Sequence, residues 1–281
     1  MSKDGGEAKR WVLEGTDYVY PRTTNKILEA YLKAKGVPAE DIMINYTPFG
    51  FSDWQTEVAA IKKFAAAGKK TAVVSTINGD SNVPFYKEFA NQGLTSENCP
   101  IVAFSVAEDE LRGMETKSLV GHLAAWNYFQ SVDTPQNKVF VKNFKAYCEK
   151  NNLPGGAKRV TDDPMEAAYI GVNIWRQAVE QAGTTHVDAV RQAIQGQHFL
   201  APGGWIQMDE GNHHLKKPVI IGEILADGQF QEVWRTKGLV RAEPWSKYVK
   251  DSKDKIADWN WPYLSGNDTV PKFKVPTPPQ K

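Results

Sequence analysis

The sequence predicts an α/β fold in which a mostly parallel β-sheet is covered by helices on both faces. Short apolar runs alternate with longer segments of helical periodicity over residues 10–105, which is the pattern of consecutive β–α–β units. The run KTAVVST at 70–76 has an unbroken apolar centre, as expected for a strand buried on both faces. A parallel sheet between two helical layers accounts for both observations.

The expected elements of this sheet follow one another in chain order, and glycine or proline separates most of them. The pattern Ser52-Asp53-Trp54-Gln55 matches a capping box, which predicts a helix start at this point. Strands are expected at 10–16, 41–47, 70–76 and 100–105, and helices at 24–35, 52–67 and 83–92.

After residue 121 the pattern changes to an extended aromatic segment, and three helices then follow without a strand between them. Thr134-Pro135 and the capping box Asp163-Pro164-Met165-Glu166 mark two of the helix starts. The second helix carries one apolar stripe, which needs a covering surface. We expect either a small helical bundle or a sheet formed by residues outside this chain. The helices are expected at 135–150, 163–182 and 187–195, and the stripe is Ala168, Val172, Trp175, Val179 and Ala182.

Two further strands are expected near the end of the chain, at 218–226 and 229–234. They flank Asp227-Gly228, which is a strong signal for a two-residue hairpin turn. The segment from residue 243 onward is rich in tryptophan, proline and lysine, and we expect it to lie along the surface.

Composition argues against several classes of protein. The chain has 281 residues and a formal net charge of +1, without the basic stripe of a nucleic-acid-binding protein. No run approaches the roughly 18 apolar residues of a membrane helix, and residues 1–10 lack the apolar core of a signal peptide. Cys99 and Cys148 form no metal or redox motif. Adjacent His213 and His214 point to opposite faces of an extended chain, which disfavours a shared metal ion. We expect no metal, cofactor or nucleic-acid partner.

Polar side chains gather where the expected strands end. In open parallel sheets, ligands bind outside the carboxyl ends of the strands. Phenols, hydroxyls, an amide and carboxylates, without a lysine nucleophile or a glycine-rich phosphate loop, suit a small, neutral, polar ligand. The candidate ligand-binding residues are Asp17, Tyr18, Tyr20, Asn78, Asp80, Ser105, Val106 and Glu108.

Several of these candidates have a structural alternative. Tyr18 and Tyr20 can instead simply cap the edge of the sheet. Asp17 is placed to cap the turn that follows it. Asn78-Gly79 matches an Asx turn, and Glu108 lies where a carboxylate stabilises a helix N-terminus. The sequence leaves both interpretations open for each residue.

Five stretches carry a resemblance to a known family. Over residues 9–261 the sequence resembles the periplasmic-binding-protein type I receptors, in particular the urea and short-chain-amide binding proteins of ABC transporters. The resemblance implies two α/β lobes joined by crossovers, with the ligand in the cleft between them. It also implies ligand contacts from a tyrosine at Tyr18 or Tyr20 and from a polar residue at Ser105. The stretches are GTDYVYPRTTN, STINGDSNVPFYKEF, PIVAFSVAEDEL, VGHLAAWNYFQSVDTP and TDDPMEAAYIGVNIW.

The same resemblance divides the chain into parts. The first half of lobe I has no counterpart, so we expect an N-terminally truncated copy that also lacks a signal peptide. The expected parts are lobe II at 1–121, a crossover at 122–132, returning lobe I helices at 133–200, a crossover with lobe II strands at 201–242, and a C-terminal tail at 243–281.

The function implied by the resemblance is capture of urea or a short-chain amide without chemical transformation. The partner would be an ABC permease, and the full-length protein would be periplasmic or anchored by lipid outside the cell. A cytoplasmic amide-sensing regulator of the same fold and a branched-chain amino-acid binding protein remain alternatives. We do not expect an enzyme, because the sequence suggests no Ser–His–acid or Cys–His constellation.

Overall fold

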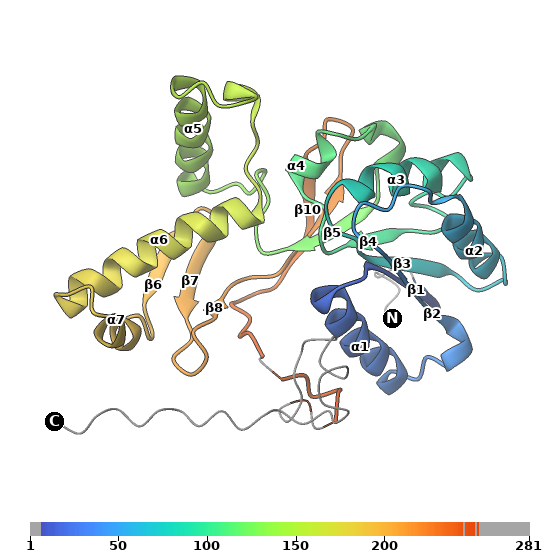
Figure 1. The fold of residues 1–281 in the computed structure, drawn as a ribbon, viewed down its shortest axis with the longest axis horizontal. Helices are drawn as coiled ribbons and strands as arrows, with labels where there is room; N and C mark the ends of the chain where they lie inside the picture. Colours follow the sequence, from blue (N-terminus) through green and yellow to red (C-terminus); the bar gives the residue numbers. More distant parts are fainter. Residues whose placement is uncertain (1–6, 244, 251, 253–281) are drawn as a thin grey trace.

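The computed structural model describes residues 7–243, 245–250 and 252, and these form two parts (Figure 1). The large part is built on a seven-stranded sheet, and the small part contains a three-stranded sheet. The elements of the large part are β1 (Arg10–Thr16), α1 (Val19–Ala34), η2 (Ala39–Asp41), β2 (Ile42–Thr47), α2 (Gln55–Ala65), β3 (Thr71–Thr76), η3 (Gly79–Ser81), α3 (Asn82–Asn91), β4 (Ile101–Ala103), α4 (Glu108–Leu111), η4 (Thr116–Leu119), β5 (Leu123–Trp126), β9 (Ile220–Ile224) and β10 (Phe230–Arg235).

The large sheet has the strand order β10-β9-β5-β4-β3-β1-β2. Strands β1 to β5 run parallel, whereas β9 pairs antiparallel with both β5 and β10. A hairpin at Asp227-Gly228 does join β9 to β10, but its loop has three residues, 226–228, and not the expected two, because Leu225 N donates to Gln229 O. The parallel order places the carboxyl ends of β1, β3 and β4 side by side at one edge.

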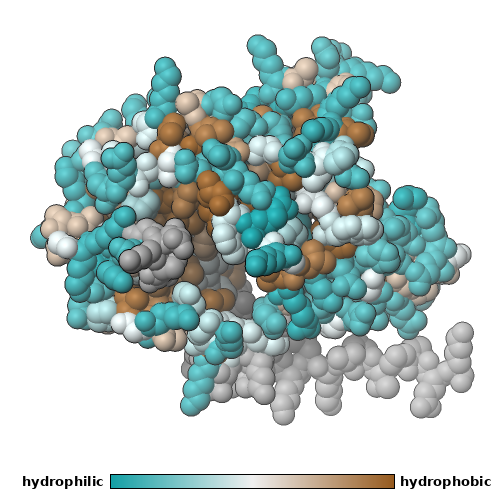
Figure 2. Space-filling view, turned by 180° about the vertical axis from the view of Figure 1, so that it is seen from behind, coloured by the Kyte–Doolittle hydropathy of each residue, from teal (hydrophilic) through white to brown (hydrophobic). Residues whose placement is uncertain are grey.

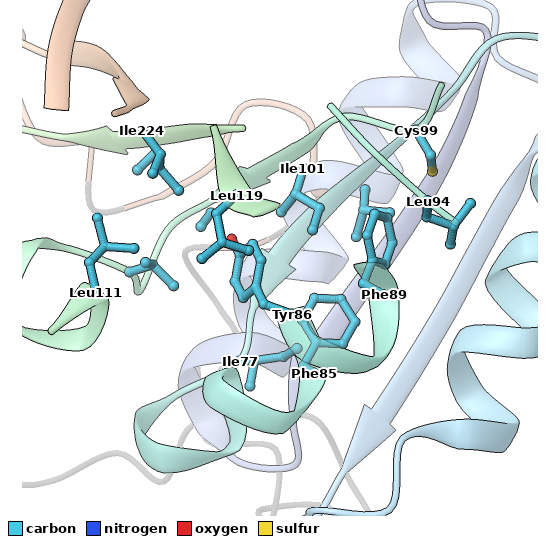
Figure 3. Packing of buried hydrophobic residues seen from close by; sticks show 14 of the residues in the cluster. Ile77, Phe85, Tyr86, Phe89, Leu94, Cys99, Ile101, Leu111, Leu119 and Ile224 are labelled. Atoms are coloured by element: carbon cyan, nitrogen blue, oxygen red, sulfur yellow. The ribbon is translucent and has the colours of Figure 1, made fainter. Parts of the chain in front are cut away.

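Helices cover both faces of this sheet, which confirms the predicted fold class. Alternate residues of β1 point to opposite faces. Leu13 packs on the α1 side, together with Leu32. Val12 packs on the other side, where α2 and α3 contribute. Figure 3 shows Phe85 and Phe89 of α3 lying among the aliphatic side chains of this second cluster.

The small part contains the three helices that follow one another without an intervening strand, and its own three-stranded sheet packs against one of them. One face of its long helix, with Ile170 and Ile174, packs against Ile206 and Met208 of the small sheet. This face is not the stripe predicted from the sequence, so its packing does not decide what covers that stripe. The elements are α5 (Pro135–Lys150), η5 (Gly156–Lys158), α6 (Asp163–Ala182), α7 (Val187–Ala193), β6 (His198–Ala201), β7 (Gly204–Met208) and β8 (Leu215–Lys216).

The apolar stripe predicted on α6 lies on a different face and is only partly covered. Val179 and Ala182 pack against α7. Val172 is 68% exposed and Trp175 is 50% exposed. Helix α6 thus carries two apolar stripes, and tertiary packing decides which one faces the sheet. Figure 2 shows hydrophobic atoms reaching the surface on both parts of the molecule.

Two expected helix starts are wrong by a few residues, and the expected cap of a third helix differs. Helix α1 begins at Val19, five residues earlier than expected, because Pro21 fits within a first helical turn. Helix α2 begins after Trp54, and no side chain caps it. Helix α6 is capped by Asp162, whose side chain accepts a hydrogen bond from Met165 N. The expected capping box at 163–166 does not form.

Two expected boundaries between parts also shift. The segment 122–132, expected as a crossover, contains β5, which is paired within the large sheet. The segment 201–216, expected as a crossover and lobe II strands, instead forms β7 and β8 beside α6. Most of the expected tail at 243–281 lies outside the described residues.

A buried ion cluster lies where the two parts join. Asn127 Nδ2 donates to Pro218 O over 2.6 Å, which holds the two connecting segments together. Lys217 Nζ lies 2.7 Å from Glu166 Oε2 and 3.4 Å from Asp163 Oδ1, and all three residues are buried. Glu166 Oε1 also accepts from Gly203 N over 2.8 Å. The Glu166 carboxylate therefore binds Lys217 and Gly203 at the junction of the two parts and does not cap the helix in the way that the sequence had suggested.

The segment after β10 returns across the molecule. Val240 bridges to Lys217, and Arg241 pairs with Asp209 of the small part. Tyr248 then contacts Tyr31 of α1 edge to face, with ring centroids 5.1 Å apart. Among the described residues, no helix combines the length and apolarity that a membrane span requires.

Candidate functional site

Four of the predicted residues meet at the carboxyl ends of β1, β3 and β4. Tyr18 Oη donates to Asn78 Oδ1 over 2.8 Å. Ser105 Oγ donates to Tyr20 Oη over 3.3 Å, and Tyr20 Oη donates to Phe104 O over 3.3 Å. The residues come from three different strand ends, so the parallel strand order brings them together.

The backbone around β1 positions the two tyrosines. Asn78 N donates to Thr16 Oγ1 over 2.9 Å, which ties the end of β3 to the end of β1. At Gly15, an added Cβ would lie 2.5 Å from Thr76 Oγ1 and 2.8 Å from Pro21 Cβ. Glycine at position 15 therefore lets the first turn of α1 lie directly over the strand end. That turn carries both phenol groups.

Aromatic rings border the cluster on one side. The rings of Tyr18 and Phe49 lie 4.8 Å apart between centroids, and those of Tyr18 and Tyr20 lie 6.0 Å apart. Phe49 is 62% exposed. Burial raises the pKa of Tyr18 and of Tyr20, so both phenols stay protonated at neutral pH. The site thus offers neutral hydroxyl and amide groups beside exposed aromatic surface.

Asp17 lies next to this cluster, but its carboxylate is already paired. Arg22 Nε lies 2.6 Å from Asp17 Oδ1, and Arg22 Nη2 lies 3.0 Å from Asp17 Oδ2. These hydrogen bonds hold the pKa of Asp17 below its ordinary value. The guanidinium also lies over the ring of Tyr46, 4.2 Å from its centroid. Asp17 does not cap α1, because Tyr18 holds that position without a side-chain hydrogen bond.

Arg22 was not among the predicted residues. The sequence feature that could have identified Arg22 is its position five residues after Asp17, in the first turn of the helix. That spacing is not a regular helical i,i+3 or i,i+4 pair. The pair forms because Asp17 is held before the helix by its backbone, whose N–H donates to Thr47 O over 2.7 Å.

Among the described residues, Asp80, Val106 and Glu108 form no side-chain hydrogen bond with these four. Asp80 is exposed. Val106 packs in the main hydrophobic core, and its carbonyl accepts from Trp126 Nε1 over 2.8 Å. Glu108 is fully buried, and its Oε1 accepts from Gln130 N over 2.6 Å. Burial raises the pKa of Glu108 to about 8. The hydrogen bond from Gln130 N shows that this carboxyl contacts the segment between β5 and α5 and not the strand-end cluster.

Hydrogen-bonding capacity remains in the cluster. Tyr18 Oη can still accept, and Asn78 Nδ2 donates to no atom of the described chain. A separate surface pocket of about 430 Å³ lies near the junction, between Gln130 and Lys142, and none of the predicted residues lines it. Within the described residues, no cluster of histidine, cysteine and carboxylate side chains is arranged to hold a metal ion. The arrangement suits binding of a small, polar molecule through neutral groups.

Solved structures of similar fold are solute-binding proteins by name. An amino acid ABC transporter substrate-binding protein from Pseudomonas fluorescens aligns with a TM-score of 0.68 and 20% identity, covering 85% of this chain and 61% of that chain. A solute-binding protein of an ABC transporter from Rhodopseudomonas palustris, in complex with p-hydroxybenzoic acid, aligns with a TM-score of 0.70 and 20% identity. That alignment covers 85% of this chain and 62% of the other. At these identities the likeness establishes the fold.

Curated relatives match shorter shares of their own length. A Brucella melitensis protein named Leu/Ile/Val-binding protein homolog 6 is 24% identical over 204 residues, which is 71% of this chain and 48% of that protein. A Geobacillus stearothermophilus protein named limonene hydroxylase is 30% identical over 149 residues, which is 53% of this chain and 26% of that protein. The chain thus spans about half the length of the first relative and about a quarter of the length of the second.

A family model extends the match across most of the chain. The model describes a periplasmic binding protein domain and covers residues 1–251. Its range includes both parts of the structure and the strand-end cluster. The chain therefore belongs to the periplasmic binding protein family.

Proposed function

We propose that this chain is the solute-binding component of an ABC importer, and that it captures urea or a short-chain amide without transforming it. The observation that carries the ligand assignment is the neutral cluster of Tyr18, Tyr20, Asn78 and Ser105. The importer role is supported by family membership and by the names of the solved structures.

An amide matches the hydrogen-bonding groups of this cluster. The amide carbonyl accepts from Asn78 Nδ2, and an amide N–H donates to Tyr18 Oη. The half-buried ring of Tyr18 and the exposed ring of Phe49 cover the flat face of the ligand. A carboxylate ligand would instead call for a cation with an open hydrogen-bonding edge. The fork of Arg22 beside the cluster is occupied by Asp17.

The remaining parts of the proposal follow from the importer role. Capture would draw the two parts together around the ligand, because a ligand stabilises the conformation that it binds more tightly. An ABC permease would receive the loaded protein. The full-length protein would act in the periplasm or outside the cell on a lipid anchor.

Isothermal titration calorimetry of the 281-residue chain tests the ligand class. We expect saturable heat with urea, acetamide or formamide, and none with leucine or 4-hydroxybenzoate. Asn78→Ala should remove the heat, and Asn143→Ala, an exposed position on α5, should keep it. Binding of leucine in place of the amides would support the branched-chain alternative. Release of ammonia from urea or acetamide would contradict the absence of chemistry.

A further inference from the structure

The positive charge at the strand-end edge comes from Arg22, which is paired with Asp17. Arg22 is the sole lysine or arginine in the loops that follow β1 to β4 and in the first turn of the helix after each loop. Asp17 occupies one edge of its guanidinium through two parallel contacts of 2.6 and 3.0 Å. Tyr46 lies against the guanidinium face. The Nε–Nη2 edge is therefore taken by a carboxylate of the protein itself.

A guanidinium edge of this kind is the standard recognition group for a carboxylate. Its two N–H groups match the two oxygens of a carboxylate in a planar, bidentate pair. An external carboxylate that approached this edge would compete with Asp17 for the same two N–H groups. A neutral amide does not need this edge, because the adjacent hydroxyls and amide supply its hydrogen bonds.

The position of the pair makes it relevant to ligands rather than to folding. Asp17 directly precedes Tyr18 in the chain, so the pair borders the cluster. The side chains of Arg22 and Asp17 are 36% and 35% exposed, and solutes can reach them. Ion pairs with this exposure contribute little to stability. Removing the Asp17 charge should therefore change ligand choice and leave the fold intact.

We propose that Asp17 is a specificity-determining residue that occupies the carboxylate-binding edge of Arg22 and so excludes anionic ligands from the strand-end cluster. This inference rests on the proposed function, in which the cluster binds the ligand. It adds that the selection of neutral over anionic ligands resides in one carboxylate.

The test compares two ligands of the same shape, acetamide and acetate. Asp17→Asn keeps the size of the side chain and removes its charge. By calorimetry at constant ionic strength, we expect this variant to bind acetate at least tenfold more tightly than the wild-type chain does. Its affinity for acetamide should stay within threefold. Adding Arg22→Gln should abolish the gain, and Asp17→Glu should preserve the wild-type selectivity.

Asp53→Asn is the matched control. Asp53 is an exposed acid in the loop after β2, at the same edge of the sheet, and it pairs with no cation of the described chain. This variant changes the net charge equally and should gain no acetate binding. Equal gains in both variants would overturn the inference, because general electrostatics would then explain them.

A second experiment measures how accessible the guanidinium of Arg22 is to a reagent. Phenylglyoxal modifies accessible arginine side chains, and peptide mass spectrometry reports the rate at Arg22. We expect a severalfold faster reaction in Asp17→Asn than in the wild-type chain and in Asp53→Asn. Unchanged reactivity at Arg22 would overturn the inference.

The outcomes separate this inference from the proposed ligand. If the wild-type chain binds no amide but Asp17→Asn gains acetate binding, the inference stands and the amide assignment fails. If the wild-type chain binds acetamide and Asp17→Asn gains no acetate binding, the inference alone fails. Tight acetate binding by the wild-type chain would contradict both.

Discussion

Replacing Glu14 by glutamine should stabilise the protein, and the gain should grow with pH. Glu14 is fully buried in β1, where its Oε2 accepts from Asn45 Nδ2 over 3.1 Å. Its Oε1 has no hydrogen-bond partner among the described residues. Burial, with the nearby charge of Glu57, raises the pKa of Glu14 from 4.5 to about 8. The folded protein therefore holds a proton that the unfolded chain releases near pH 4.5.

The sign of the pH effect follows from this linkage. A carboxyl with a raised pKa costs nothing below its unfolded pKa, and it destabilises the fold progressively as the pH rises to its folded pKa. The slope is about 1.4 kcal/mol per pH unit. The advantage of Glu14→Gln should thus increase by about 3 kcal/mol between pH 5 and pH 7. It should level off above pH 8, at a total on the order of 5 kcal/mol.

Guanidinium chloride unfolding, followed by tryptophan fluorescence at pH 5, 7 and 9, measures this difference. Urea is unsuitable as the denaturant because it is a proposed ligand. Glu108 titrates in the same range, but it is present in both proteins and cancels in the comparison. Glu97→Gln at an exposed position is the control and should show no pH-dependent gain. A constant difference between Glu14→Gln and the wild-type chain would refute the linkage argument.

Three further changes have expected outcomes. Tyr18→Phe removes the hydrogen bond to Asn78 and should weaken binding of the proposed amide roughly tenfold by calorimetry, with about 1 kcal/mol or less of stability lost. Lys217→Met leaves the buried Glu166 carboxylate without its cation and should cost about 3–5 kcal/mol in the free energy of unfolding. Adding Glu166→Gln should recover part of that loss, and a larger loss in the double variant would contradict the charge argument. Trp175→Ser, at a half-exposed position, should change the free energy of unfolding by about 0.5 kcal/mol or less.

The candidate site shows which of its features local sequence patterns could predict. Tyr18, Asn78 and Ser105 each follow an apolar strand, and parallel strands bring their carboxyl ends to one edge. Their meeting was predictable for that reason. Val106 and Glu108 follow the same strand as Ser105, yet their side chains turn into the interior. That difference depends on the path of the loop before α4, which no strand or helix periodicity specifies.

The sequence by itself determined the α/β class, the parallel direction of the first strands and the polar character of their ends, because these depend on the alternation of strands with helices and on continuous apolar runs in the strands. The tertiary structure decided which of two apolar stripes of α6 meets the small sheet and that Glu166 pairs with Lys217. It also decided that Asp17 pairs with Arg22 instead of capping α1. A side chain with several possible partners takes the one that long-range packing brings within reach, and packing is a property of the whole chain.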